Sequence, residues 1–236
     1  VDDKTLMPSF FSCKGVGASA IDEILQNRPY ENIKDLFWNE DGSWKHSKLN
    51  KKTMESLIKI RALDSLGIDE YFPTYKSFYD VVVGNWNMLR KRTKKNPFQG
   101  YENLKEIVLE CTDEEWSAKE IMSFEEEIIG TINIRSLIPD SIQEKFEELQ
   151  IAPIEEWDGK NLYWMVPTKI MNKKTKNGKK YFLIEAVGSN GQKSRIFCWG
   201  PPPDAVLDPY CLCAIELDKN DFGFSTQWRK VKQFRI

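Results

Sequence analysis

The apolar positions of this chain follow one period over roughly its first two thirds and another period over the rest. Up to about residue 160 they recur every three or four residues, which is the spacing of amphipathic helices. From residue 161 they form short runs of aromatic and β-branched residues between turn-forming stretches, a pattern typical of strands. The sequence therefore predicts an α+β fold that is mostly α-helical first and all-β at the end.

Several helices are expected in the first part. One begins at Ala18, directly after Gly15-Val16-Gly17, and its apolar face consists of Ala20, Ile21, Ile24 and Leu25. Others are expected over residues 30–38, 51–60, 71–89 and 141–150, and Asn50 is a good N-cap for the second of these. A further short helix carries the adjacent glutamates 125–127, with Ser123 as its expected N-cap.

Five strands are expected in the last part, over residues 162–171, 181–187, 192–199, 210–217 and 224–234. The first two enclose a basic loop whose Asn177-Gly178 pair is a strong hairpin signal. Five strands with a long first hairpin suit a small barrel of the oligonucleotide-binding (OB) type.

The formal net charge of −2 hides a strong segregation of charge. Residues 1–100 carry a net +3, residues 101–160 carry −12 and residues 161–236 carry +7. An acidic middle between two basic ends favours nucleic acid as a partner of the ends. Five cysteines without paired spacing predict a reducing, cytoplasmic environment, and no apolar run is long enough to span a membrane. Because the sequence begins at Val1 rather than Met, we expect a part of a longer protein.

The stretch from Lys14 to Ser19 is the first candidate binding site. Its glycines permit a tight turn, and the helix that follows presents unpaired N–H groups and the positive end of its dipole. A nucleic-acid phosphate is the anion we expect there, held by Lys14, Gly15, Val16, Gly17, Ala18 and Ser19. The alternative that these residues leave open is a tight helix-to-helix turn without a ligand.

Two basic stretches and a set of aromatic residues are further candidates for contact with DNA. The run that opens with Arg90, Lys91 and Arg92 either binds phosphates without reading sequence or is a solvated loop. The loop between the first two strands favours DNA over protection of a sheet edge, because it carries Lys173, Lys174, Lys176, Lys179 and Lys180. Four aromatic residues either stack on bases or fill the barrel core: Tyr181, Phe197, Trp228 and Trp199, the last of which we include among the predicted contacts.

The order of these elements resembles the C-terminal region of the C-family bacterial and phage replicative DNA polymerases, the DNA polymerase III alpha subunits. The resemblance rests on four stretches: KGVG with its helix at residue 14, LNKKTMESLIKIRALDSLG at 49–67, an acidic E-x-E-x-x-G pattern at 125–130, and TKNGKK at 175–180. In that family the helix matching 51–60 commonly ends in Gly-Ala-Phe-Asp. Here Arg61 replaces the glycine, so we expect its side chain to contact phosphate instead of the backbone.

The resemblance implies three segments: a paired helix-hairpin-helix DNA-binding domain at 1–70, a helical connector with an acidic helix at 71–160, and an OB-fold domain at 161–236. It implies the non-catalytic, DNA-binding part of a DNA-directed DNA polymerase, a nucleotidyltransferase of DNA replication. The hairpin then holds duplex DNA, and the barrel holds the single-stranded template. A catalytic polymerase part and a sliding clamp are the implied protein partners, although the middle segment holds no convincing clamp-binding peptide.

The sequence contains no catalytic constellation, metal site or cofactor motif. His46 is the single histidine and lies in a polar loop, where we expect it at the surface. Clustered carboxylates for two metal ions are missing, and Cys211 and Cys213 lack the second pair that a zinc site needs. Two other classes stay open: an interaction module that docks replication proteins without DNA affinity, and a nuclease or repair enzyme built on helix-hairpin-helix units.

Overall fold

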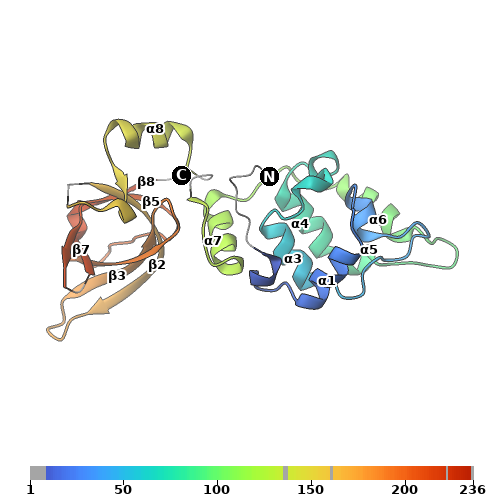
Figure 1. The fold of residues 1–236 in the computed structure, drawn as a ribbon, viewed down its shortest axis with the longest axis horizontal. Helices are drawn as coiled ribbons and strands as arrows, with labels where there is room; N and C mark the ends of the chain where they lie inside the picture. The colour runs from blue at the N-terminus through green and yellow to red at the C-terminus, as the bar shows by residue number, and fades with distance from the viewer. Residues whose placement is uncertain (1–8, 135–137, 160–161, 222, 235–236) are drawn as a thin grey trace. The chain divides into compact units, whose positions relative to one another are not determined.

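The computed structural model describes residues 9–134, 138–159, 162–221 and 223–234. The chain forms two compact units, residues 1–130 and residues 131–236. The first unit is helical and the second is mainly a curled sheet (Figure 1). This is the α+β order that the sequence predicts, while the finer functional division at residues 70 and 160 stays a prediction. None of the helices in the described ranges has the length and apolar character that crossing a membrane requires.

The first unit packs short helices around one apolar core. Their bounds in chain order are η1 Phe10–Ser12, α1 Ala18–Gln26, α2 Ile33–Phe37, α3 Lys51–Lys59, η2 Asp64–Leu66, η3 Ile68–Glu70, α4 Tyr75–Gly84, α5 Trp86–Leu89, α6 Gln99–Val108 and α7 Ala118–Ile128. The apolar face expected for the first helix is buried at Ala20, Ile21 and Ile24. Leu25 is a correction, since it is 48% exposed at the edge of that face.

Helix caps agree with the sequence at one position and differ at another. The Asn50 side chain accepts the N–H of Thr53 (3.0 Å), which confirms it as the N-cap of α3. Helix α7 begins earlier than expected, because Ser117 and Glu120 form a reciprocal capping box. Ser123 therefore lies inside α7 and does not cap it.

A carboxylate on α1 fixes the loop that leads into α3. Glu23 accepts the backbone N–H groups of Ser47 (2.7 Å), Lys48 (2.8 Å) and Leu49 (2.9 Å). Burial raises the pKa of this carboxyl, but the hydrogen bonds outweigh burial and lower the pKa to about 2. The carboxylate therefore helps to hold α1 against α3, the two helices that frame the candidate hairpin.

His46 is not at the surface, contrary to the sequence prediction. It is 3% exposed, and its Nε2 donates to the carbonyl oxygen of Leu36 (2.8 Å). Burial is the main cause that lowers its pKa, so the buried ring is held neutral. The polar loop around it closes over the core because Trp38 and Trp44 pair across the loop as an isolated β-bridge.

Within the described residues, the second unit contains one α-helix, two short 3-10 helices and a mixed sheet of eight strands. Its elements are α8 Asp140–Glu148, β1 Ala152–Pro153, η5 Ile154–Glu156, β2 Tyr163–Lys174, β3 Lys180–Val187, β4 Lys193–Trp199, β5 Leu212–Ile215, β6 Asp218–Asn220, β7 Gly223–Gln227, η6 Trp228–Lys230 and β8 Val231–Phe234. The strand order is β6-β7-β4-β3-β2-β5-β8, with β1 paired to β2. Strands β4 and β7 run parallel, as do β1 and β2, and the remaining pairs are antiparallel.

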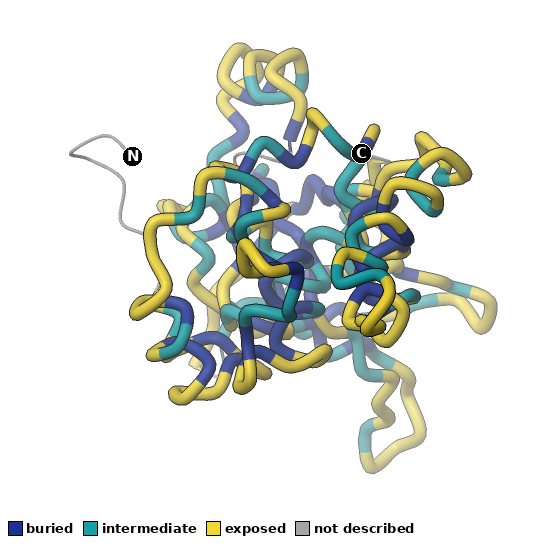
Figure 2. Tube along the Cα trace, turned by 90° about the vertical axis from the view of Figure 1, so that its right-hand side faces the viewer, coloured by how far each residue is buried: buried dark blue, intermediate teal, exposed yellow. Residues whose placement is uncertain are grey.

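The expected five-stranded barrel is therefore wrong in strand count and in closure, since the sheet curls but stays open between β6 and β8. The expected last strand is divided into β7 and β8 by the 3-10 turn η6. Strand β2 belongs to both halves of the sheet: residues 163–165 pair with β5, and a bulge after Pro167 turns the strand toward its long pairing with β3. Alternate side chains of β3 and β4, Phe182, Ile184, Ile196 and Cys198, fill the core. Figure 2 shows buried and exposed positions following one another along the trace, with exposed positions at the projecting loops.

Candidate nucleic-acid interface

The first candidate site is the turn between η1 and α1. Gly15 has a φ of +83°, a conformation that side-chain-bearing residues rarely adopt. A Cβ atom at this position would lie 2.5 Å from the Oγ of Ser56, so α3 packs directly on the turn. The Thr53 hydroxyl fixes the same contact by donating to the Gly15 carbonyl oxygen (3.1 Å). The turn thus requires glycine both for its backbone and for its packing.

The turn presents a row of unpaired backbone donors. Lys14 N–H donates to Ile128 (2.8 Å) and Val16 N–H to Cys13 (3.3 Å). Within the described part of the chain, the N–H groups of the other residues find no protein acceptor: Gly15, Gly17, Ala18 and Ser19. These four residues are exposed, whereas Val16 is buried and serves the packing of the turn. Among the described residues no side chain caps α1, which leaves these N–H groups to an anion from outside.

A small basic hollow adjoins this turn. It has a volume of about 50 Å³, and its lining combines three lysines with one glutamate: Lys14, Gly15, Lys52, Ser56, Lys59, Glu127 and Ile128. The Lys59 ammonium is paired with Glu55 (2.7 Å), while Lys14 is exposed and has no ion-pair partner in the described ranges. Sequence reasoning missed Lys52, which lies on the first turn of α3 and reaches the hairpin only because α3 packs against Gly15.

The turn after α3 places Arg61 where the resemblance expects a glycine. Arg61 has a φ of +54°, in the left-handed region, and Ala62 N–H donates back to the Leu57 carbonyl oxygen (3.0 Å). The backbone thus keeps the glycine-like conformation with an arginine in place. The guanidinium lies over the ring of Tyr75 (5.0 Å to its centroid) and 3.4 Å from a carboxylate oxygen of Glu115.

Glu115 occupies the space beside Arg61. Its carboxylate accepts the N–H groups of Tyr75 (3.1 Å), Lys76 (3.2 Å) and Trp116 (2.8 Å). Two of these N–H groups belong to the first turn of helix α4. The second hairpin, by which we mean the turn after α3 and the segment up to the start of α4, therefore already binds a carboxylate of its own chain. This carboxylate therefore competes with a phosphate for the guanidinium of Arg61.

The basic run in the connecting loop is partly engaged as well. The Arg90 guanidinium lies 5.7 Å from the ring centroid of Trp44, and Arg92 pairs with Asp41 (3.2 Å). Lys91 is exposed and has no ion-pair partner in the described ranges. Of these three predicted contacts, Lys91 is therefore the most accessible to a phosphate.

In the second unit, the predicted lysine loop forms the tip of the β2–β3 hairpin, which extends past the neighbouring strands (Figure 1). Gly178 has a φ of +75°, and Thr175 N–H donates to the Lys179 carbonyl oxygen (2.9 Å), as expected for a turn built on Asn177-Gly178. The five lysines, Lys173, Lys174, Lys176, Lys179 and Lys180, are exposed, and none has an ion-pair partner in the described ranges.

Three of the four candidate aromatic residues meet on the outer face of the sheet. Strand register sets Tyr181 opposite Trp199, and Phe197 follows two residues along β4 on the same face. The ring centroids of Tyr181 and Trp199 are 4.8 Å apart, and Phe197 lies parallel to Trp199 at 6.2 Å. All three are half-buried, and Lys173 stands opposite Tyr181 on β2. Trp228 lies elsewhere, edge-on to the core residue Phe182.

Comparison with known proteins agrees with the geometry of the first hairpin. A family model described as a helix-hairpin-helix motif matches residues 1–71, and the comparison with curated proteins found no match. Residues 1–8 of the matched range lie outside the described residues. The helix-hairpin-helix motif indicates a nucleic-acid-binding module with DNA as partner.

Proposed function

We propose that this chain is the non-catalytic, DNA-binding part of a C-family replicative DNA polymerase, with a duplex grip in the first unit and a single-strand grip in the second. The observation that carries the proposal is the first hairpin, where four exposed residues next to Lys14 have backbone N–H groups without an acceptor among the described residues. Backbone donors at a helix N-terminus bind phosphate oxygens and read no base. Such a grip suits duplex DNA of any sequence.

The second grip is the hairpin of five lysines together with the aromatic triad, which we define as Tyr181, Phe197 and Trp199. Stacked rings on a sheet offer platforms for unpaired bases, and lysines beside them follow the phosphates. The triad lies on the face opposite the core, so its rings are available without unfolding the sheet. Single-stranded template is therefore the ligand we assign to the second unit.

The polymerase assignment itself is supported by the order of the motifs. A helix-hairpin-helix match at 1–71 is followed by α7 with its three adjacent glutamates, 125–127, and then by a curled sheet with a lysine hairpin. This is the order on which the resemblance rests. A catalytic polymerase chain and a sliding clamp belong to the same proposal as its partners.

The test is binding of the full chain to labelled duplex, single-stranded and primer–template DNA, measured by fluorescence anisotropy across a salt series. Lys14→Glu is expected to weaken duplex binding about tenfold at low salt and to reduce the log–log salt slope by about 1. Lys119→Glu is the matched control, because Lys119 is an exposed lysine on α7 outside the site. Equal losses in both variants would mean that net charge, and not the hairpin, sets the affinity.

The second grip is tested with Trp199→Ala on single-stranded DNA. Loss of one stacking platform is worth about 1–3 kcal/mol, so an affinity loss of about 5- to 150-fold is expected, with duplex binding unchanged. If the wild-type chain binds no DNA at low salt, the proposed function is wrong, and the interaction module becomes the better description.

A further inference from the structure

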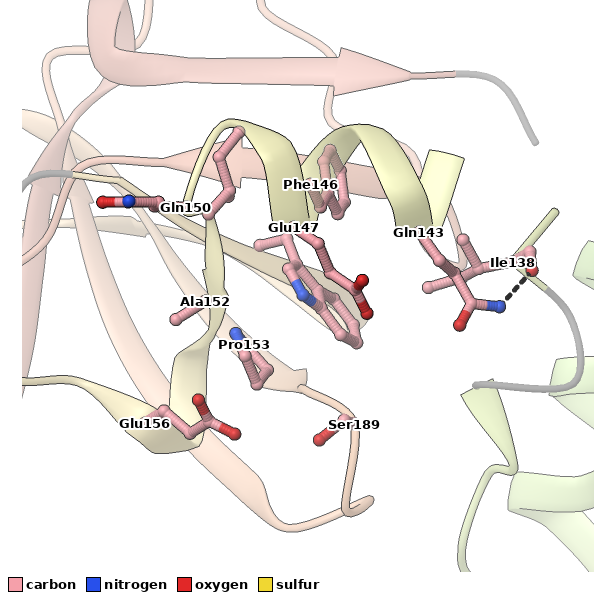
Figure 3. Close-up of a pocket in the computed structure, with 11 residues that line it drawn as sticks. Ile138, Gln143, Phe146, Glu147, Gln150, Ala152, Pro153, Glu156 and Ser189 are labelled. Carbon is pink, nitrogen blue, oxygen red and sulfur yellow. Dashed lines mark hydrogen bonds between the residues drawn. The ribbon is translucent and has the colours of Figure 1, made fainter. Parts of the chain in front are cut away.

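We propose that a pocket under helix α8 is a docking site for a short basic peptide segment of a partner protein, centred on one bulky apolar side chain. The pocket has a volume of about 460 Å³ and lies wholly within the second unit. Figure 3 shows α8 above it, with Ala152, Pro153 and Glu156 below and Ser189 on a neighbouring turn. The inference goes beyond DNA binding and does not depend on it.

The floor of the pocket is apolar and already ordered. Phe146 and Trp164 stack with their ring centroids 6.2 Å apart, and Ile138 and Ile151 lie beside them. All four side chains are buried, so the floor is held by the fold before any ligand arrives. A pocket of this volume accepts one large side chain such as Leu, Phe or Trp together with adjoining backbone.

The rim of the pocket is acidic. Glu147 on α8 and Glu156 on η5 both line it, both are exposed, and neither has an ion-pair partner in the described ranges. Gln150 adds a side-chain amide, which offers both a donor and an acceptor to a peptide backbone. Carboxylates beside an apolar floor favour a ligand that is apolar at its centre and cationic at its flanks.

The surrounding chain extends the same charge. Residues 138–159 contain seven acidic residues and one lysine. This field repels a phosphate backbone, so the pocket is unsuited to nucleic acid. Charge complementarity therefore selects Lys and Arg flanking an apolar anchor, and a protein segment is the macromolecule that offers this pattern.

The experiment measures binding of the full chain to synthetic acetylated hexapeptides by fluorescence polarisation. Each peptide has one central Leu, Phe or Trp flanked by lysines, and a matched set carries glutamates in place of the lysines. The lysine set is expected to bind, and the glutamate set is not. The double variant Glu147→Lys/Glu156→Lys is expected to lose about tenfold in affinity, since two attractive contacts become repulsive.

Glu144→Lys is the matched control, because Glu144 is exposed on the same helix but does not line the pocket. Its peptide affinity is expected to stay within about twofold of wild type. Three results would overturn the proposal: no peptide binds, the control loses as much affinity as the double variant, or the pocket variants abolish self-association of the chain in sedimentation, which would make a second copy the occupant. DNA affinity is measured separately, and a failure to bind DNA would contradict the proposed function but not the peptide site.

Discussion

The contact between Arg61 and Glu115 provides a sharp test of how the second hairpin works. Glu115→Gln removes one negative charge and keeps one acceptor oxygen, so one of two bonds is retained: that from Tyr75 N–H, which donates to Oε2, or that from Lys76 N–H, which donates to Oε1. The guanidinium of Arg61 then loses its carboxylate partner at 3.4 Å. We expect duplex DNA to bind more tightly to this variant, because Arg61 becomes available to a phosphate.

The size of the effect follows from the exposure of the pair. The side chain of Arg61 is 44% exposed and that of Glu115 is 36% exposed, so the ion pair is strongly screened by solvent. Breaking such a pair costs about 0.5–1 kcal/mol, and a phosphate that no longer competes with it binds about two- to fivefold more tightly. One additional phosphate contact also steepens the log–log salt slope by about 0.9.

The assay is duplex binding by anisotropy at several salt concentrations, with thermal unfolding to verify that α4 keeps its cap. Glu110→Gln is the matched control, because Glu110 is exposed and has no ion-pair partner in the described ranges. The decisive comparison places Glu115→Gln in an Arg61→Gln background, where the gain must vanish. A gain that persists without Arg61 refutes the reasoning, since it would come from net charge alone.

Two further predictions concern stability. Glu23→Gln is expected to lower the free energy of unfolding at pH 7 by about 2 kcal/mol. The pKa of Glu23 is about 2 in the folded state and 4.5 for an unperturbed glutamate, so the difference from wild type is present above pH 4.5 and shrinks as the pH falls toward 2. Urea titrations at pH 7 and pH 3 measure this difference. Gly188→Ala places a Cβ 1.6 Å from a carboxylate oxygen of Glu155 and so displaces the hydrogen bonds that Ser189 (2.5 Å) and Asn190 (2.8 Å) donate to this carboxylate. The free energy of unfolding is expected to fall by about 1–3 kcal/mol. An unchanged midpoint of urea unfolding would contradict this.

The first hairpin could be predicted from the sequence because its information is local. Gly15 supplies the positive φ, and the apolar residues that follow at helical spacing fix which face of α1 turns inward. The neighbours of the hairpin were not predictable in this way. Lys52 reaches the turn only through the packing of α3 on Gly15, and Glu115 reaches Arg61 from 54 residues away.

The sheet illustrates the same limit. Strands with alternating apolar residues, such as β3 and β4, were found at nearly the expected positions. Strands β1 and β6 were missed because Ala152-Pro153 is too short to show a period and residues 218–220 are both short and polar. The parallel pairing of β4 with β7 joins segments distant in sequence, and no turn motif in the sequence predicts this pairing. Strand register, which brings Tyr181 opposite Trp199, emerged only from the fold.

The carboxylates in the acidic middle of the chain have different roles in the folded protein. A net −12 over residues 101–160 reads as a uniform surface that repels DNA. In the fold, Glu115 pairs with Arg61 at the surface, while Glu147 and Glu156 have no ion-pair partner among the described residues and lie at the rim of an apolar pocket. The first is an internal competitor for phosphate, and the other two attract cations. Since these carboxylates act on different ligands, raising the salt concentration should weaken both the peptide and the DNA contacts, whereas substituting one set should leave the other interaction intact.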